Sequence, residues 1–285
     1  MPADFRIDDR RVRLSDDRRA LPLQRTPAPS IDVGEASRLA RRLGIGASPR
    51  DDGRFVVVRD ERSSLEVFRA SGSLRWTLDA HDGEARGAEP QLPDEGEAAR
   101  IARSFLADHD LASDALREPT VARSVALRAE RGGEPVAVTV ARQVCFSYEL
   151  AGVPVFGPGA KAQVTVGDGG EIVGWYRFWR DAVAEDLVPV LPADRAYEVF
   201  TADHAFADLG DDATVEVTDA ALGYLALPPQ EAQGYLVPVW AFSAVTSTEV
   251  LPAYGFTRYV VAAVDVTAER VKALGAVHRA PQAVL

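Results

Sequence analysis

The segment best suited to recognising a ligand or a partner is Trp-Tyr-Arg-Phe-Trp-Arg at residues 175–180. On a strand, Trp175, Arg177 and Trp179 would share one face, and Tyr176 would point to the other. An arginine between tryptophans can stack as a cation–π pair and bind a carboxylate. Tryptophan and arginine are also enriched at interface hot spots. The pattern therefore predicts a binding surface.

Arg142 interrupts the apolar face of another expected strand and extends this prediction. The candidate residues for partner or ligand binding are Arg142, Trp175, Tyr176, Arg177 and Trp179. Aromatic residues on both faces of one strand also fit a second interpretation, in which one sheet docks on a neighbouring unit of the same chain. Both interpretations remain open from the sequence.

The four histidines are His81, His109, His204 and His278, and no two of them have the spacing of metal ligands. We therefore predict no metal site and no cofactor. His109, flanked by aspartates, fits a general base or metal ligand, but a residue at the C-terminal end of a helix is the preferred interpretation. His204 fits a partly buried position on a helix stripe better than a ligand.

Other side chains capable of catalysis also fit structural roles. Cys145 lies on the more polar face of its expected strand, with no base nearby in the sequence, so packing is preferred to nucleophilic chemistry. Carboxylate pairs such as Asp51–Asp52 fall in polar turns, where solvation keeps both acids ionised. No Gly-x-Ser-x-Gly motif occurs. We predict no catalytic residues.

The composition excludes some partners. The chain has 285 residues, 47% of them hydrophobic and 26% charged, and a formal net charge of −11. A nucleic-acid surface needs clustered lysine and arginine, so nucleic acid is not expected as a partner. No apolar run is long enough to span a bilayer. The alternating acids and bases of residues 1–30 predict a flexible, solvated N-terminal arm.

Hydrophobic periodicity predicts repeated groups of one helix followed by strands. Residues 31–90 contain a helix at 35–44 and strands at 55–59, 64–69 and 73–78, a helix-plus-meander unit. Residues 91–190 contain a helix starting after Asp94 and strands at 137–150, 160–166 and 171–180, with a hairpin at 168–170. Residues 191–285 repeat this order, with a helix opening at Pro192.

The turns of the second group resemble a known superfamily. Gly152–Gly157 reads Gly-Val-Pro-Val-Phe-Gly, and Gly167–Val173 holds an Asp-Gly hairpin. A second similar motif consists of Tyr235–Phe242 followed by Tyr259–Val264. These motifs, over about residues 92–266, are similar to the PepSY and thermolysin/fungalysin-propeptide superfamily. The resemblance implies a helix on a small antiparallel sheet, a role in peptidase inhibition or envelope regulation, and a location outside the cytoplasm. No His-Glu-x-x-His occurs, so the chain is not the zinc peptidase itself.

The sequence thus predicts an α+β fold of tandem units, each with one helix packed on a small antiparallel sheet, in a PepSY/cystatin-like architecture. The expected function is that of a non-enzymatic binding or regulatory protein, of peptidase-inhibitor type, that recognises a protein or peptide through a sheet surface or edge. The alternative is an enzyme or carrier with a small-molecule pocket between the sheets. Exposed Trp175 and Trp179 would favour the first, and a closed polar cavity the second. The location is extracytoplasmic if a leader has been removed and cytoplasmic otherwise.

Overall fold

The computed structural model describes residues 4–7, 18–78, 90–128, 134, 136–202, 213–247 and 253–263. The helices are α1 Val33–Arg42, α2 Glu95–Asp108 and α3 Ala193–Thr201. The strands are β1 Asp4–Ile7, β2 Ala20–Arg25, β3 Arg50–Asp51, β4 Phe55–Arg59, β5 Ser63–Phe68, β6 Leu74–Leu78, β7 Thr120–Arg128, β8 Val136–Leu150, β9 Val153–Phe156, β10 Lys161–Val166, β11 Ile172–Phe178, β12 Val183–Pro189, β13 Thr214–Leu225, β14 Tyr235–Ser247 and β15 Tyr254–Val261.

The strands form one continuous sheet rather than tandem small sheets. Its main path runs β12-β2-β14-β13-β9-β8-β10-β11-β6-β5-β4-β3. The sheet is mixed, because β13 pairs in parallel with both β1 and β9 while the other pairs are antiparallel. The predicted fold of separate helix-on-sheet units is therefore wrong. The α+β class and the dominance of antiparallel pairing are correct.

The error arose from pairing between segments that are distant in the sequence. β6, from the first expected unit, pairs with β11 of the second, in the register Trp76↔Trp175. Residues 20–25, which we had placed in the solvated arm, form β2 between β12 and β14. Leu21 and Leu23 of that strand are buried. The domain boundaries expected from the sequence stay a prediction.

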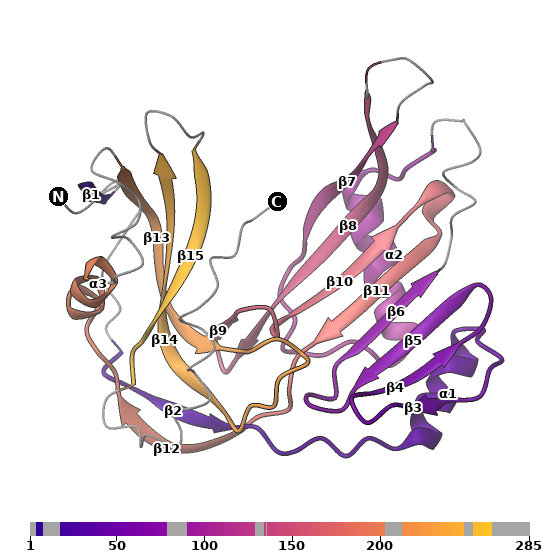
Figure 1. Cartoon of the computed structure of the whole chain (residues 1–285), viewed down its shortest axis with the longest axis horizontal. Helices are drawn as coiled ribbons and strands as arrows, with labels where there is room; N and C mark the ends of the chain where they lie inside the picture. Colours follow the sequence, from indigo (N-terminus) through magenta and orange to yellow (C-terminus); the bar gives the residue numbers. More distant parts are fainter. Residues whose placement is uncertain are drawn as a thin grey trace.

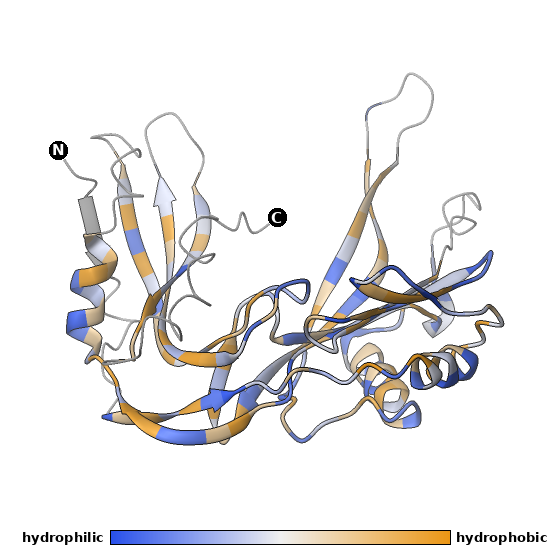
Figure 2. Cartoon of the chain, turned by 60° about the horizontal axis from the view of Figure 1, so that its bottom comes forward, coloured by the Kyte–Doolittle hydropathy of each residue, from blue (hydrophilic) through white to orange (hydrophobic). Residues whose placement is uncertain are grey.

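Two groups of strands flank β9 (Figure 1). We call β3–β8, β10 and β11 the helix-backed half, because α1 and α2 both lie against one face of it (Figure 2). α1 packs mainly on β4 and β5, whereas α2 packs on β7, β8 and β10. α3 packs on β14 and β15, in the other group.

The two helices of the helix-backed half form close to where their sequences predict, although α1 spans 33–42 rather than the expected 35–44. The Asp32 side chain caps α1 by accepting from the Gly34 N–H at 2.8 Å, and Asp94 caps α2 through the Glu97 N–H at 2.8 Å. Gly44, just beyond α1, has φ +82°, which favours glycine at a helix end. Ala98 and Ala102 of α2 are fully buried, as the helical stripe predicts.

The long alternating stretch from 137 to 180 forms the predicted ribbon of adjacent antiparallel strands. β8, β10 and β11 pair in the register Val144↔Val164↔Trp175. All three side chains are buried on the face that α2 covers. Gly169 and Gly170, with φ +61° and +87°, make the predicted hairpin between β10 and β11.

A close approach of backbones at β9 joins the two groups of strands. A Cβ at Gly157 would lie 2.4 Å from the Ala226 carbonyl oxygen, and one at Gly159 would lie 2.0 Å from the Leu227 carbonyl oxygen. Both distances are shorter than any real contact, so only glycine fits. The buried Arg180 guanidinium reinforces the junction by donating to the carbonyls of Leu227, Pro228 and Glu231 at 2.8, 2.9 and 2.6 Å.

We expect Arg180→Met to lower the free energy of unfolding by about 3 kcal/mol, because it leaves buried carbonyls without a donor. Arg195→Met is the matched control: Arg195 is exposed on α3 and pairs with Glu198 one turn away, so a change within about 0.5 kcal/mol is expected. Urea unfolding of both variants measures the difference. Equal stability of the two would contradict a structural role for Arg180.

Candidate ligand-binding pocket

A cavity of about 840 Å³ lies on the helix-covered face of the helix-backed half. α1, the linker Pro27–Asp32 and Leu111, just after α2, form its walls. Its floor consists of Val67, Leu74 and Arg177, which are neighbours in the register of β5, β6 and β11. The cavity arises because α1 packs on β4 and β5 and α2 on β7, β8 and β10, so β6 and β11 lie between the two helices.

Arg177 is a charged residue in an otherwise apolar row. Across the sheet the row reads Val67, Leu74, Arg177, Ala162 and Phe146, and its four apolar members are buried. A guanidinium in such a row costs solvation energy. Packing alone does not explain why an arginine occupies this position in the row.

The neighbours of Arg177 hold its guanidinium in one orientation. Its Cζ lies 4.7 Å from the centre of the Trp179 ring, in a cation–π contact. The Tyr148 ring stacks on Trp179 at 5.5 Å with an interplanar angle of 15°. Burial lowers the pKa of Arg177, while Asp181 and Tyr148 act in the opposite direction. Arg177 Nε is shielded from solvent and has no hydrogen-bond partner among the described residues.

The predicted alternation along β11 is correct, but its tryptophans are not exposed. Trp175 and Trp179 are 2% and 8% exposed. Trp175 lies 6.1 Å from Phe105 of α2, which places it on the helix-covered face. Tyr176 lies on the opposite face, where it stacks on Phe178 at 4.4 Å. Trp175 is therefore covered by α2, whereas Trp179, although mostly buried, lines the pocket.

Several charged residues of the pocket lining form ion pairs with one another. The lining includes four arginines and four acids: Arg38, Arg41, Arg42, Arg177, Asp32, Glu35, Asp110 and Asp181. Arg38 pairs with Asp32 and Glu35 at 3.4 and 3.7 Å, and Arg42 with Asp110 at 2.8 Å. The charges of the lining thus balance, and the arginine in its floor is the half-buried Arg177.

Arg142 does not belong to this pocket. Its register partner on β10 is Val166, which pairs with Ile172, five residues along β11 from Arg177. Arg142 Nε donates to the Pro93 carbonyl at 3.3 Å, just before α2. The contact holds the start of α2 against β8, so the structure gives Arg142 a packing role there.

Tyr176 and Cys145 meet on the helix-free face. The Tyr176 hydroxyl donates to Gln163 Oε1 at 3.0 Å, and Cys145 Sγ lies 3.5 Å from the same oxygen. Burial raises the pKa of the Cys145 thiol, and nearby Lys161 only partly opposes this effect. A raised pKa reduces the thiolate that nucleophilic chemistry requires. Both side chains are separated from the pocket by the sheet.

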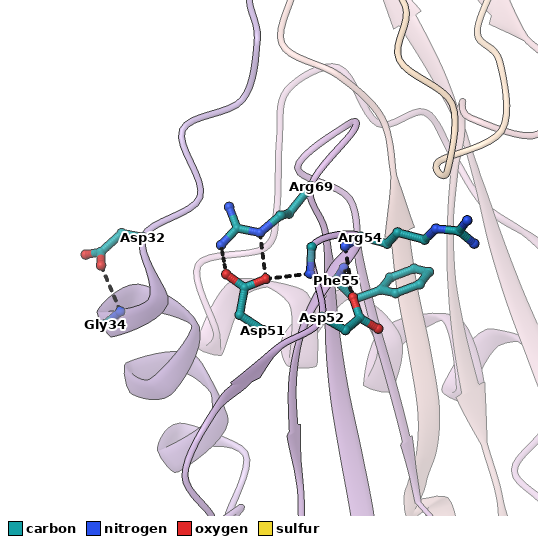
Figure 3. Close-up of polar contacts among 8 residues, drawn as sticks. Asp32, Gly34, Asp51, Asp52, Arg54, Phe55 and Arg69 are labelled. Atoms are coloured by element: carbon teal, nitrogen blue, oxygen red, sulfur yellow. Dashed lines mark hydrogen bonds and ion pairs between the residues drawn. The ribbon is translucent and has the colours of Figure 1, made fainter.

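The carboxylate pair Asp51–Asp52 has the turn role that its sequence predicts (Figure 3). Asp51 accepts from the Gly53 N–H and from the Arg69 guanidinium, and Asp52 accepts from the N–H groups of Arg54 and Phe55. The Arg69 side chain lowers the pKa of Asp51 most, and the Phe55 N–H that of Asp52. Neither acid is held protonated as a general acid would be.

His109 is the residue that ends α2, as expected, and it also lines the pocket. Its ring lies 4.6 Å from Phe105, and its Nδ1 is buried without a hydrogen-bond partner among the described residues. His81, His204 and His278 lie outside the described residues. Within those that are described, no cluster of three or more His, Cys, Asp or Glu could hold a metal ion.

The pocket residues that the sequence analysis missed come from four separate segments. They include Leu39, Arg41, Leu74, Leu111 and Asp181. One signal was present: Arg38, Arg41 and Arg42 give α1 a basic side next to its apolar stripe. The pairing of β6 with β11 that brings α1 opposite Arg177 had no local signature.

We expect Arg177→Met to change the free energy of unfolding by no more than about 1 kcal/mol. The variant loses a cation–π contact but removes a charge from an apolar row, and these effects oppose each other. Urea unfolding of Arg177→Met and Arg180→Met under the same conditions compares the free energies of unfolding of the two variants. A loss as large as that of Arg180→Met would show that Arg177 is a structural residue.

A second prediction concerns pH. Burial, aided by Asp181, raises the pKa of Tyr148 to about 12, and burial raises that of Tyr176 to about 12. Both pKa values lie above the ordinary tyrosine value of about 10, so folding favours the neutral form of each side chain. The stability that the two neutral tyrosines contribute is present below pH ~10 and is lost as the pH rises towards 12. We expect a late tyrosinate step in an absorbance titration, reduced in Tyr148→Phe. Completion of the titration near the ordinary value would contradict burial of this layer.

Among the residues that the structure describes, no helix combines the length and apolar character needed to cross a bilayer. No protein-family model matches the chain, and no curated protein matches it. The resemblance to the PepSY superfamily therefore stays a prediction. A solved structure of an uncharacterized protein from Eubacterium rectale ATCC 33656 is similar, with a TM-score of 0.50 and 12% sequence identity over 85% of this chain and 82% of that one. At this identity the likeness concerns the fold alone.

Proposed function

We propose that the chain is a non-enzymatic binding protein that holds its ligand in the pocket between α1, the end of α2 and the sheet. The observation that carries this proposal is the concave cavity with the half-buried Arg177 in its floor. Because Trp175 and Trp179 are covered, a flat recognition surface built on them is not available. The binding role expected from the sequence is therefore proposed for the pocket and not for a sheet surface.

The dimensions of the cavity fit a small ligand or a short chain segment. Small-molecule pockets usually measure about 300–1,000 Å³, and they combine apolar walls with a few polar groups. Here Leu39, Leu74 and Leu111 supply apolar surface, and Arg177 supplies the half-buried polar group. A folded partner domain would not enter a cavity of this size.

The chemistry of the lining supports binding without turnover. Asp32 and Glu35 pair with Arg38, and Asp110 pairs with Arg42, so these acids are engaged in ion pairs. A general acid or base at neutral pH needs a pKa moved towards neutrality by burial. The Cys145 thiol lies beyond the sheet, on its other face.

A second candidate is recognition of an extended peptide along β7. Among the strands that the structure describes, this strand pairs with β8 alone, so no described strand covers its other edge. Val125 and Leu127 of β7 and Val136 of β8 are 55%, 74% and 63% exposed. An edge with apolar side chains can accept a guest strand through main-chain hydrogen bonds.

The test is ligand-detected NMR with a fragment set of neutral, cationic and anionic compounds. Ala28 is exposed and lines the pocket, so Ala28→Trp should fill the pocket and abolish the signals of bound fragments. Ala107→Trp is the matched control, because Ala107 is exposed on α2 and does not line the pocket. Fragments should be recovered chemically unchanged.

Three outcomes would contradict the proposal. One is binding that is unaffected by Ala28→Trp. Another is conversion of a bound fragment into a product. The last is peptide capture that survives Ala28→Trp and is lost in Leu127→Lys, a result that would favour the β7 edge instead.

A further inference from the structure

We infer that the ligand is a monoanion in which a carboxylate is attached to an apolar body, and that the Arg177 guanidinium binds the carboxylate. This inference rests on the proposed function, because it assigns a chemical class to the occupant of the same pocket. The assignment follows from the position of Arg177, the balance of charge around it and the shape of the space above it.

Arg177 is placed where only a specific anion would stabilise it. Its row on the sheet is otherwise Val67, Leu74, Ala162 and Phe146, so the sheet itself offers no acceptor on either side. No ion pair joins Arg177 to a described acid, and Asp181 acts on it only at longer range. A half-buried cation without an acid partner loses part of its solvation, and a bound anion would offset that loss.

The guanidinium is already oriented for such an anion. Trp179 is held on both sides, by Arg177 at 4.7 Å and by Tyr148 at 5.5 Å. Trp179 itself lines the cavity, and its contact with Arg177 makes it a positioning residue for the guanidinium. Nε is shielded, so the terminal NH₂ groups are the part of Arg177 that can meet a ligand in the cavity. A flat carboxylate can accept from both terminal groups at once.

The charged residues around Arg177 favour a ligand that carries one negative charge. The lining carries four arginines and four acids, of which Arg38 and Arg42 are already paired with acids. A phosphate group, with up to two charges, would face Asp110 and Asp181 with only the Arg177 guanidinium in the floor to balance it. A monoanion matches this single guanidinium.

The remainder of the ligand is apolar for a geometric reason. Leu39 of α1, Leu74 of β6 and Leu111 lie around the same cavity as Arg177. A carboxylate bound at the floor would leave its attached group against these leucines. Two sources share this chemistry: a free apolar carboxylic acid, and the C-terminal residue of a peptide that ends in an apolar side chain.

Titration calorimetry of the full chain tests the inference with matched acid and amide probes. The free-acid arm uses 3-phenylpropionate and octanoate against their amides. The peptide arm uses acetyl-Ala-Ala-Leu with a free carboxylate against the same peptide amide. In at least one arm the acid should bind about tenfold or more tightly than its amide, since a charge-assisted bidentate contact is lost in the amide.

Variants then assign the preference to Arg177. Arg177→Met should reduce the acid to the affinity of its amide, and Arg177→Lys should retain only part of the preference because it loses the planar fork. Arg100→Met is the control: Arg100 is exposed on α2 and does not line the pocket, so its loss should leave the preference within about twofold.

Equal binding of acid and amide in both arms would overturn the inference, and so would a preference that persists in Arg177→Met. Binding of neither member of any pair would overturn it too. Ala28→Trp distinguishes failure of this inference from failure of the proposed function. If acid and amide bind equally and Ala28→Trp abolishes the binding of both, the pocket remains the binding site and only the carboxylate assignment is wrong.

Discussion

The width of a helix relative to a strand determines where this protein has a cavity. A helix with its side chains is about 10 Å across, and strands are about 4.8 Å apart, so one helix covers about two strands. α1 lies over β4 and β5, and α2 over the strands around β8 and β10. β6 and β11 lie between these groups in the sheet order, and they provide Leu74 and Arg177 for the floor of the pocket.

Two arginines close together on the chain, the buried Arg180 and the half-buried Arg177, have different roles because of what their surroundings offer. Arg180 meets the carbonyls of Leu227, Pro228 and Glu231, which the glycines at 157 and 159 allow to come close. Arg177 meets an indole, a row of apolar side chains and an open cavity. The terminal nitrogens of Arg180 bind protein carbonyls and stabilise the junction at β9, although its Nε, like that of Arg177, has no hydrogen-bond partner among the described residues. Arg177 finds no acceptor in its row, which is the pattern expected of a binding residue.

The sequence was sufficient for the local elements. Alternation predicted the ribbon of β8, β10 and β11, the helix expected after Asp94 is α2, and Gly169–Gly170 made the expected hairpin. These features depend on neighbours in the chain, which periodicity and turn chemistry describe.

The assembly was not predictable in the same way. Ala20–Arg25 looked like part of a charged arm because acids and bases surround it, although Leu21 and Leu23 carry the alternation of a strand. The pairing of β6 with β11 and of β9 with β13 joins segments that are far apart in the sequence. The pocket depends on these pairings, so Arg177 and Trp179 could be identified as candidates but the leucines opposite them could not.

A crystal structure of the protein with 3-phenylpropionate tests the central claim most directly. The claim predicts the carboxylate within about 3 Å of the terminal nitrogens of Arg177, with the phenyl ring towards Leu39, Leu74 and Leu111. A structure in which the Arg177 guanidinium instead forms a direct ion pair with Asp181, while the compound lies elsewhere or is absent, would contradict it.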